Sequence, residues 1–223
     1  MRSLPLPLAL TARLTPVAVL ACAGWMLSSG PAAPSSAAGH PPGSSTPARP
    51  DSAPSSPAAE PKTYTTAPAP CASVPAAAVK SLVPGARTAG KEIPSTDTEL
   101  RRTCSWNALK GYDYRWLDVS FEVTASDRQA AKEYEQTVTG KSGGGTVPGL
   151  GDSAYSVVNL TTEDGQQTRE GTVVARVSNA LVVVTYNGSD FETKRAPGTD
   201  EVNKGAIRAA RAAVAALRDG RSG

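Results

Sequence analysis

Thr146-Val-Pro-Gly-Leu-Gly-Asp-Ser-Ala-Tyr155 is the stretch around which we expect the fold to be organised. It closes a glycine-rich run at residues 140–145 and precedes an apolar segment that is typical of a strand. Glycine tolerates backbone angles that other residues resist, and proline fixes its own, so a sharp turn is expected here. We predict that this turn opens the central strand of the domain at Ala154.

Hydrophobic periodicity on either side of the stretch predicts three helices and about five strands. The clearest strand covers residues 114–123, where apolar Leu117, Val119 and Phe121 alternate with polar side chains. A loop is expected over residues 161–167. The expected helices cover residues 73–83, 127–138 and 199–218, and the expected strands cover residues 102–109, 114–123, 154–160, 171–178 and 181–186.

This element order, α-β-β-α-β-β-β-α, groups the strands into hairpins rather than alternating them with helices. Such grouping is typical of an α+β domain. We therefore expect an antiparallel sheet of about five strands with the helices packed on one face. The domain is expected to cover residues 71–220. The sequence does not indicate whether its glycine loop at residues 140–145 is ordered.

Residues 1–27 have the layout of an export signal, with Arg2 and Arg13 before an apolar run that is short for a membrane span. Val19-Leu-Ala-Cys22 is similar to the motif at which bacterial lipoproteins are cut and lipidated at the cysteine. Cleavage near Ala33 or Ala38, or an uncleaved anchor, are alternatives. All of them place the domain outside the cytoplasm, held to the membrane by a lipid on Cys22 or by the uncleaved signal, or secreted.

Residues 28–70 are rich in proline, alanine and serine and almost free of large apolar side chains. Such a segment cannot bury enough surface to offset the entropy of ordering, so we expect a disordered tether. From Cys71 onward the chain carries 19 Lys or Arg and 18 Asp or Glu, a net charge of +1. This near-neutral balance argues against nucleic acid as a partner.

The three cysteines are Cys22, Cys71 and Cys104. With Cys22 acylated or removed, one pair remains in an exported domain, which predicts a disulfide between Cys71 and Cys104. Two thiols without a nearby histidine make a poor metal site, so no metal is expected.

Gly151-Asp-Ser153 resembles the nucleophile motif of one esterase family. Such chemistry needs a base, normally histidine, and the single histidine of the chain, His40, lies in the expected tether. We therefore expect no enzyme, and a hydrolase that uses Ser153 is only the alternative. The glycines also mimic a dinucleotide fingerprint, but a helix precedes them and a strand follows, so no cofactor is expected.

Tyr114 and Trp116 fall on the polar side of their predicted strand, where another segment covers them or they are exposed. Exposed aromatic side chains mark interaction surfaces. We expect a binding surface for an envelope ligand or protein partner from residues of this strand and of the opening stretch: Tyr114, Trp116, Gly149, Gly151, Asp152 and Tyr155.

Several features together resemble an actinobacterial family of exported, often lipidated proteins known as domain of unknown function 3558. These features are Cys71 before a short helix, Cys104-Ser-Trp106 in a strand, the Gly149-Leu-Gly-Asp-Ser-Ala154 run, and an alanine-rich closing helix. The sequence is also similar to extracellular sensor domains of bacterial serine/threonine kinases. The resemblance implies an exported binding or sensing module and gives no catalytic residues to carry over.

Overall fold

The computed structural model describes residues 62–220 of the chain. The expected export signal, Cys22, the alternative cleavage positions and residues 28–61 of the expected tether lie outside the described residues. Within the described part, no helix combines the length and apolar character needed to cross a membrane.

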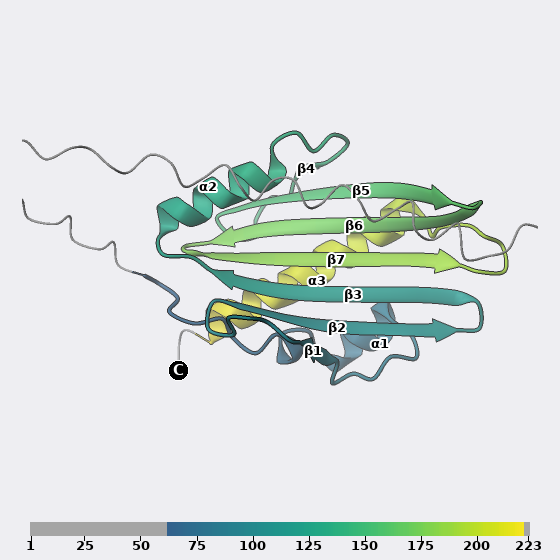
Figure 1. Cartoon of the computed structure of the whole chain (residues 1–223), viewed down its shortest axis with the longest axis horizontal. Helices are drawn as coiled ribbons and strands as arrows, with labels where there is room; N and C mark the ends of the chain where they lie inside the picture. Colours follow the sequence, from purple (N-terminus) through teal and green to yellow (C-terminus); the bar gives the residue numbers. More distant parts are fainter. Residues whose placement is uncertain (1–61, 221–223) are drawn as a thin grey trace, which may run out of the picture. The chain divides into compact units, whose positions relative to one another are not determined.

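The described part is an α+β domain with three α-helices, one short 3-10 helix and one antiparallel sheet of seven strands (Figure 1). The elements, in chain order, are η2 (Pro70–Ala72), α1 (Ala76–Leu82), β1 (Lys91–Ile93), β2 (Arg101–Lys110), β3 (Asp113–Val123), α2 (Asp127–Val138), β4 (Gly145–Thr146), β5 (Ser153–Glu163), β6 (Gln166–Val177), β7 (Ala180–Asp190) and α3 (Thr199–Asp219).

The strand order is β1-β2-β3-β7-β6-β5-β4, so the sheet has two more strands than the sequence predicts. The additional strands β1 and β4 have three and two residues and form the two edges. Strands this short show no alternating pattern, which explains why the sequence did not reveal them. Short edge strands also limit edge-to-edge pairing with other chains.

The prediction that the strand after Thr146 is central is wrong, because β7 occupies the middle of the sheet. β5 lies beside the edge strand β4, whereas β7 pairs with β3 on one side and with β6 on the other. The sequence of β7 agrees with its position, since four of its first five residues are buried. A nearly continuous apolar run is typical of a strand covered on both faces.

The expected loop at residues 161–167 is instead a continuation of two strands. β5 and β6 pair as far as Glu163 and Gln166, and only Asp164 and Gly165 connect them. Both connecting residues have positive φ, of 50° and 78°. This is the geometry that favours Asp-Gly in two-residue hairpins, so the turn was encoded in a dipeptide that the sequence analysis did not use.

The main hydrophobic core lies between α3 and one face of the sheet, which we call the first face. Figure 1 shows α3 running behind the strands. Small residues let the helix approach closely: a Cβ at Gly171 would meet Val202, and one at Gly205 would meet the Tyr186 ring. The core contains Leu117, Val119 and Phe121 of β3, Val173 and Ala175 of β6, Val182 and Val184 of β7, and Ala206, Ala209, Ala210, Ala213 and Val214 of α3.

The expectation that all helices pack on one face is wrong for α2. This helix lies against β6 and β7 and buries Ala130. Strand register places Val157, Val174 and Leu181 on the second face of the sheet. Together with Ala130, they are buried outside the main core cluster. α2 therefore covers one end of the second face, near the turn between β6 and β7.

The folded part begins before Cys71, the position expected from the sequence. Tyr64 and Ala67 are buried in the main core. The side chain of Asn179 holds this segment: its oxygen accepts hydrogen bonds from the N–H groups of Thr63 and Tyr64, and its nitrogen donates to the Tyr64 carbonyl. The chain thus joins the domain at the end of the sheet where β6 turns into β7 (Figure 1).

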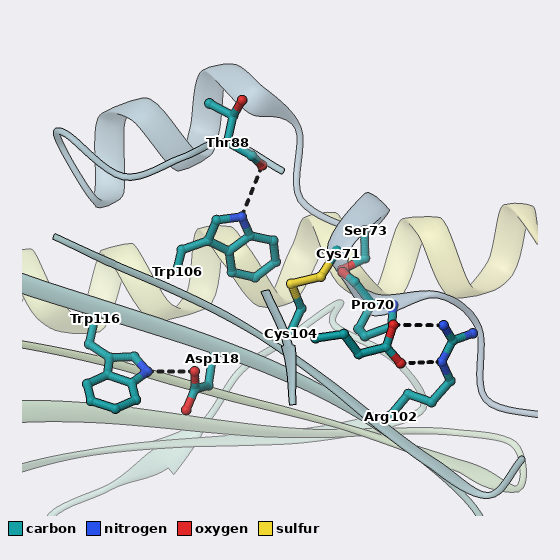
Figure 2. Close-up of a disulfide and its surroundings, with 10 residues drawn as sticks. Pro70, Cys71, Ser73, Thr88, Arg102, Cys104, Trp106, Trp116 and Asp118 are labelled. Atoms are coloured by element: carbon teal, nitrogen blue, oxygen red, sulfur yellow. Dashed lines mark hydrogen bonds and ion pairs between the residues drawn. A yellow bond between two sulfur atoms is a disulfide. The ribbon is translucent and has the colours of Figure 1, made fainter. Parts of the chain in front are cut away.

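The predicted disulfide between Cys71 and Cys104 is present and joins η2 to β2 (Figure 2). Beside it, the buried Trp106 donates its indole N–H to the Thr88 carbonyl at 3.0 Å. A Cβ at Gly90 would collide with both Cys104 and Trp106, and its φ is +67°. The loop before β1 therefore needs glycine at this position in order to pass over the disulfide.

The first helix is shorter than the expected range of residues 73–83. The Ser73 hydroxyl donates to the Pro70 carbonyl, and α1 starts after Pro75. Ser126 caps α2 by accepting a hydrogen bond from the Gln129 N–H, and Gly220 follows the last turn of α3.

Candidate functional site

The second face of the sheet is divided into a covered end and an open end. α2 covers the end near Ser178, and in the described part no helix packs over the other end, where β2 turns into β3. We call this open surface the aromatic face. It is formed by side chains of β2, β3 and β7 that the register places on the same side: Asn107, Leu109, Tyr114, Trp116, Asp118 and Asn187.

Trp116 is half-buried and held in a fixed orientation. Its indole N–H donates to the Asp118 carboxylate at 2.6 Å, along the same strand (Figure 2). This hydrogen bond directs the polar edge of the indole into the protein surface. Because the bond involves a charged acceptor, it is stronger than a neutral one.

Tyr114 stands against Trp116 almost at a right angle. The ring centroids are 6.3 Å apart and the planes meet at 82°. On its other side, Tyr114 packs on the exposed Phe191 with a centroid distance of 6.0 Å. Burial raises the pKa of the Tyr114 hydroxyl, and the Asp118 carboxylate raises it further, so the phenol stays neutral and able to donate a hydrogen bond.

More apolar side chains continue this surface around the strand ends. Leu109, Tyr112 and Phe191 are each about half exposed, at 57, 58 and 48 %. Leu109 is the direct partner of Tyr114 across β2 and β3. These residues were not among those predicted from the sequence, although the alternation of β2 around Trp106 places Leu109 on the opposite side from the buried tryptophan.

The residues predicted around the glycine stretch lie elsewhere. Tyr155 is on β5, and the register aligns it with Ser120 of β3, four residues along from Trp116. Strands about 4.8 Å apart with a rise of about 3.4 Å per residue then separate Tyr155 from Trp116 by about 20 Å. The predicted residues therefore form two separate groups rather than one surface.

The polar groups of the second group bond within the domain. Asp152 accepts a hydrogen bond from the Ser178 N–H at 2.6 Å and pairs with Arg176. The Tyr155 hydroxyl donates to the Lys141 carbonyl at 2.8 Å. Gly151 has φ of +65°, and a Cβ there would meet the Arg176 carbonyl oxygen. The contacts of Asp152 and Gly151 join the turn before β5 to the β6–β7 turn, and the Tyr155 contact joins β5 to the loop after α2. These groups therefore stabilise the fold.

A small hollow of about 210 Å³ lies beside this turn, between Tyr134 and residues 146–154. Ligand pockets normally hold about 300–1,000 Å³, so the hollow is small for a ligand of drug size. Gly149 has a positive φ, and a Cβ at this residue would meet no other atom within 4 Å.

Ser153 lies in the same hollow without the partners of a nucleophile. Ser153 and Tyr134 line the hollow together, and the pKa of Tyr134 is raised mainly by burial. The cross-strand partner of Ser153 is Arg176, a residue that does not act as a base. The only histidine, His40, is outside the described residues. Within residues 62–220, no group of three metal-binding side chains comes together.

Comparison with known proteins finds no matching family and no matching curated protein. Two solved structures are distantly similar. A protein from Bacteroides thetaiotaomicron VPI-5482 has a TM-score of 0.26 and 11 % identity, over 53 % of this chain and 47 % of that chain. The extracellular domain of PknH from Mycobacterium tuberculosis has a TM-score of 0.26 and 12 % identity, over 53 % of this chain and 64 % of that chain.

The chain thus matches about half of the first structure and less than two thirds of the second. The second is an extracellular domain of the kind that the sequence resembles. At this level of similarity, neither structure assigns a function. Membership in the domain of unknown function 3558 family stays a prediction.

Proposed function

We propose that this protein is an exported binding module of the cell envelope and that it captures its ligand or partner on the aromatic face. One observation carries the proposal: Trp116 and Tyr114 lie on an open sheet face, with the indole fixed by Asp118. Exposed clusters of aromatic side chains on a rigid sheet are typical of interaction sites. Their sheet position keeps the cost of ordering them on binding low.

Export is supported by the layout of residues 1–27 and by the disulfide, which needs an oxidising compartment to persist. In our proposal a lipid on Cys22 holds the protein to the membrane. Cleavage near Ala33 or Ala38 would instead release the same module.

The aromatic face lies at the end of the sheet opposite to the end where the chain enters the domain, which suits binding away from a membrane anchor. The folded chain begins at the Asn179 end of the sheet, and the aromatic face lies toward the end where β2 turns into β3. Figure 1 shows these two turns at opposite ends of the strands. The proposed surface therefore lies away from the point at which the tether joins the domain.

We propose binding rather than catalysis. Among the described residues, the cross-strand partner of Ser153 is Arg176, which does not act as a base, and there is no histidine. The aromatic face contributes a single carboxylate, Asp118, which already accepts the indole N–H.

The test uses the mature full-length protein and envelopes isolated from the producing organism. Co-sedimentation would compare wild type, Trp116→Ala and a matched control, Leu160→Ala. Leu160 is 48 % exposed and lies on β5, with its side chain on the first face. We expect binding to fall at least tenfold for Trp116→Ala, since about 1.4 kcal/mol of lost contact is sufficient, and to stay unchanged for the control.

Melting curves would check that each variant folds, and Tyr114→Ala provides a second variant if Trp116→Ala is unstable. Equal sedimentation of wild type and a folded Trp116→Ala protein would refute the aromatic face as the binding surface.

A further inference from the structure

Strand register arranges polar side chains in a row on both sides of Trp116. Asn107 of β2 and Asn187 of β7 are its direct partners across the sheet, and beyond Asn187 follow Glu170 of β6 and Asn159 of β5. With strands about 4.8 Å apart, the row from β2 to β5 is about 19 Å long. Residues far apart in the sequence therefore form one continuous strip on the open second face.

The far end of the strip is hollowed. A depression of about 780 Å³ is lined by residues of the long β5–β6 hairpin, among them Asn159, Thr161, Thr168 and Glu170. Only β7 separates this depression from β3 and Trp116. The volume is within the range of ligand-binding sites. The aromatic corner and the depression are thus two parts of one elongated site.

The hydrogen-bonding groups of the strip are available. Among residues 62–220, the side-chain amides of Asn107 and Asn187 have no hydrogen-bond partner, and both are at least partly exposed. An amide can both donate and accept, which suits a ligand with neighbouring hydroxyl groups.

The charges of the strip are all negative. Glu170 lies in the strip, and Asp118 lies beside it on β3. Glu163 and Asp164 border the depression. Two arginines of these strands are engaged on the first face: Arg115 pairs with Glu201 of α3, and Arg169 donates to the Pro197 carbonyl. Arg101 and Arg176 lie on the second face, but at its covered end, where they pair with Glu122 and Asp152. At the β2 end of the strip, Lys91 lies across from Ser105, and it lines a hollow with Arg87 and Asn107. An anionic polymer that reached the depression of β5 and β6 would meet repulsion there.

We propose that this strip binds an uncharged sugar chain that lies across the strands, which deepens the proposed function and rests on it. The apolar face of one sugar ring packs in the corner between Trp116 and Tyr114, whose planes meet at 82°. Its hydroxyl groups bond to the Asn107 and Asn187 amides. The following sugar units cross β7 and place their hydroxyls against the oxygen-rich depression of β5 and β6.

Uncharged hexasaccharides test the proposal directly. Isothermal titration of the mature full-length protein would use a hexamer of N-acetylglucosamine and a hexamer of glucose, with a hexamer of galacturonic acid as the anionic counterpart. We expect at least one uncharged hexamer to bind and the anionic one to bind at least tenfold more weakly. Trp116→Ala and Asn187→Ala should each weaken the binding at least fivefold, and Leu160→Ala should leave it unchanged.

A change of charge sharpens the test. Glu170→Gln keeps the shape of the side chain and removes one negative charge from the strip. We expect it to bring the affinity for the galacturonic acid hexamer closer to that for the uncharged hexamers by several-fold.

Each other outcome has a definite meaning. Lack of binding by both uncharged hexamers, equal binding of the anionic hexamer, or binding that is insensitive to Trp116→Ala would overturn the sugar proposal. If envelope binding still depends on Trp116 in that case, the proposed function stands and only the ligand class is wrong. If envelope binding is also insensitive to Trp116, both proposals fail.

Discussion

The turn between β4 and β5, residues 147–152, which we call the glycine turn, differs from the aromatic face in what the polar groups in and around it do. In the glycine turn, Asp152 bonds to the Ser178 backbone and Tyr155 to the Lys141 backbone. On the aromatic face, the Asn107 and Asn187 amides have no partner in the described part of the chain. Groups that are bonded within a protein stabilise it, whereas polar and aromatic groups left open on a rigid sheet are available to a ligand. Changes in the first region should therefore affect stability, and changes in the second should affect binding.

The largest effect is expected from Gly151→Ala in the glycine turn. Its φ of +65° disfavours any side chain, and the new Cβ would meet the Arg176 carbonyl oxygen. We expect a loss of about 2–3 kcal/mol in the free energy of unfolding. Gly149→Ala is the matched control, because its φ is +69° but its Cβ would meet nothing within 4 Å. It should cost only about 1 kcal/mol.

Urea denaturation followed by circular dichroism measures both variants. Envelope binding should persist wherever the protein remains folded. Equal costs for the two substitutions would show that the Arg176 contact contributes nothing.

A pair of alanine substitutions compares the two regions directly. Asp152→Ala removes a charged hydrogen bond to the Ser178 N–H and should cost about 1 kcal/mol, since the carboxylate is partly exposed. Asn187→Ala removes no hydrogen bond and should change stability by about 0.5 kcal/mol or less. Binding to envelopes should instead fall more for Asn187→Ala than for Asp152→Ala. Weaker binding by Asp152→Ala than by Asn187→Ala would contradict the assignment of stability to the glycine turn and binding to the aromatic face.

The smallest effect is expected from lowering the pH, which protonates Asp190 at the edge of the aromatic face. Asp190 precedes Phe191, and hydrogen bonds from the Thr193 N–H, then from its hydroxyl and from the Glu192 N–H, lower the pKa of its carboxyl below 3.8. A carboxyl whose pKa is lower in the folded state stabilises the protein above the unfolded pKa, and this is lost as the pH falls through the folded value.

We therefore expect the melting temperature of wild type to lose a small increment below pH 3.8 that Asp190→Asn does not show. The aromatic signal in near-ultraviolet circular dichroism would report whether Phe191 loosens from Tyr114. Identical pH profiles for the two proteins would exclude this contribution.

Much of the fold could be predicted from the sequence, because burial imposes a local period on the side chains. β3 was correct almost to the residue because Leu117, Val119 and Phe121 face the core. α3 was correct because its small and apolar residues repeat at helical spacing. The edge strands β1 and β4 were missed because two or three residues contain no period.

The candidate site was predicted less well. Tyr114 and Trp116 were selected because they break the alternation of their strand, and the structure leaves both partly exposed. Gly149, Gly151, Asp152 and Tyr155 were grouped with them on their sequence character alone, but strand order separates the two groups. Asn107, Asn187 and Glu170 carry no distinguishing feature in the sequence, and only their alignment beside Trp116 makes them candidates.

The sequence by itself determined the helices and longer strands and the pairing of Cys71 with Cys104, and it placed two aromatic side chains on the polar side of β3. These features follow from local spacing and from the even number of cysteines left in the domain. Only the tertiary structure decided that β7 is central, that α2 covers one end of the second face, and that the aromatic residues lie beside the Asn187–Glu170–Asn159 row. Strand order and register depend on pairings between distant segments, which no local pattern specifies.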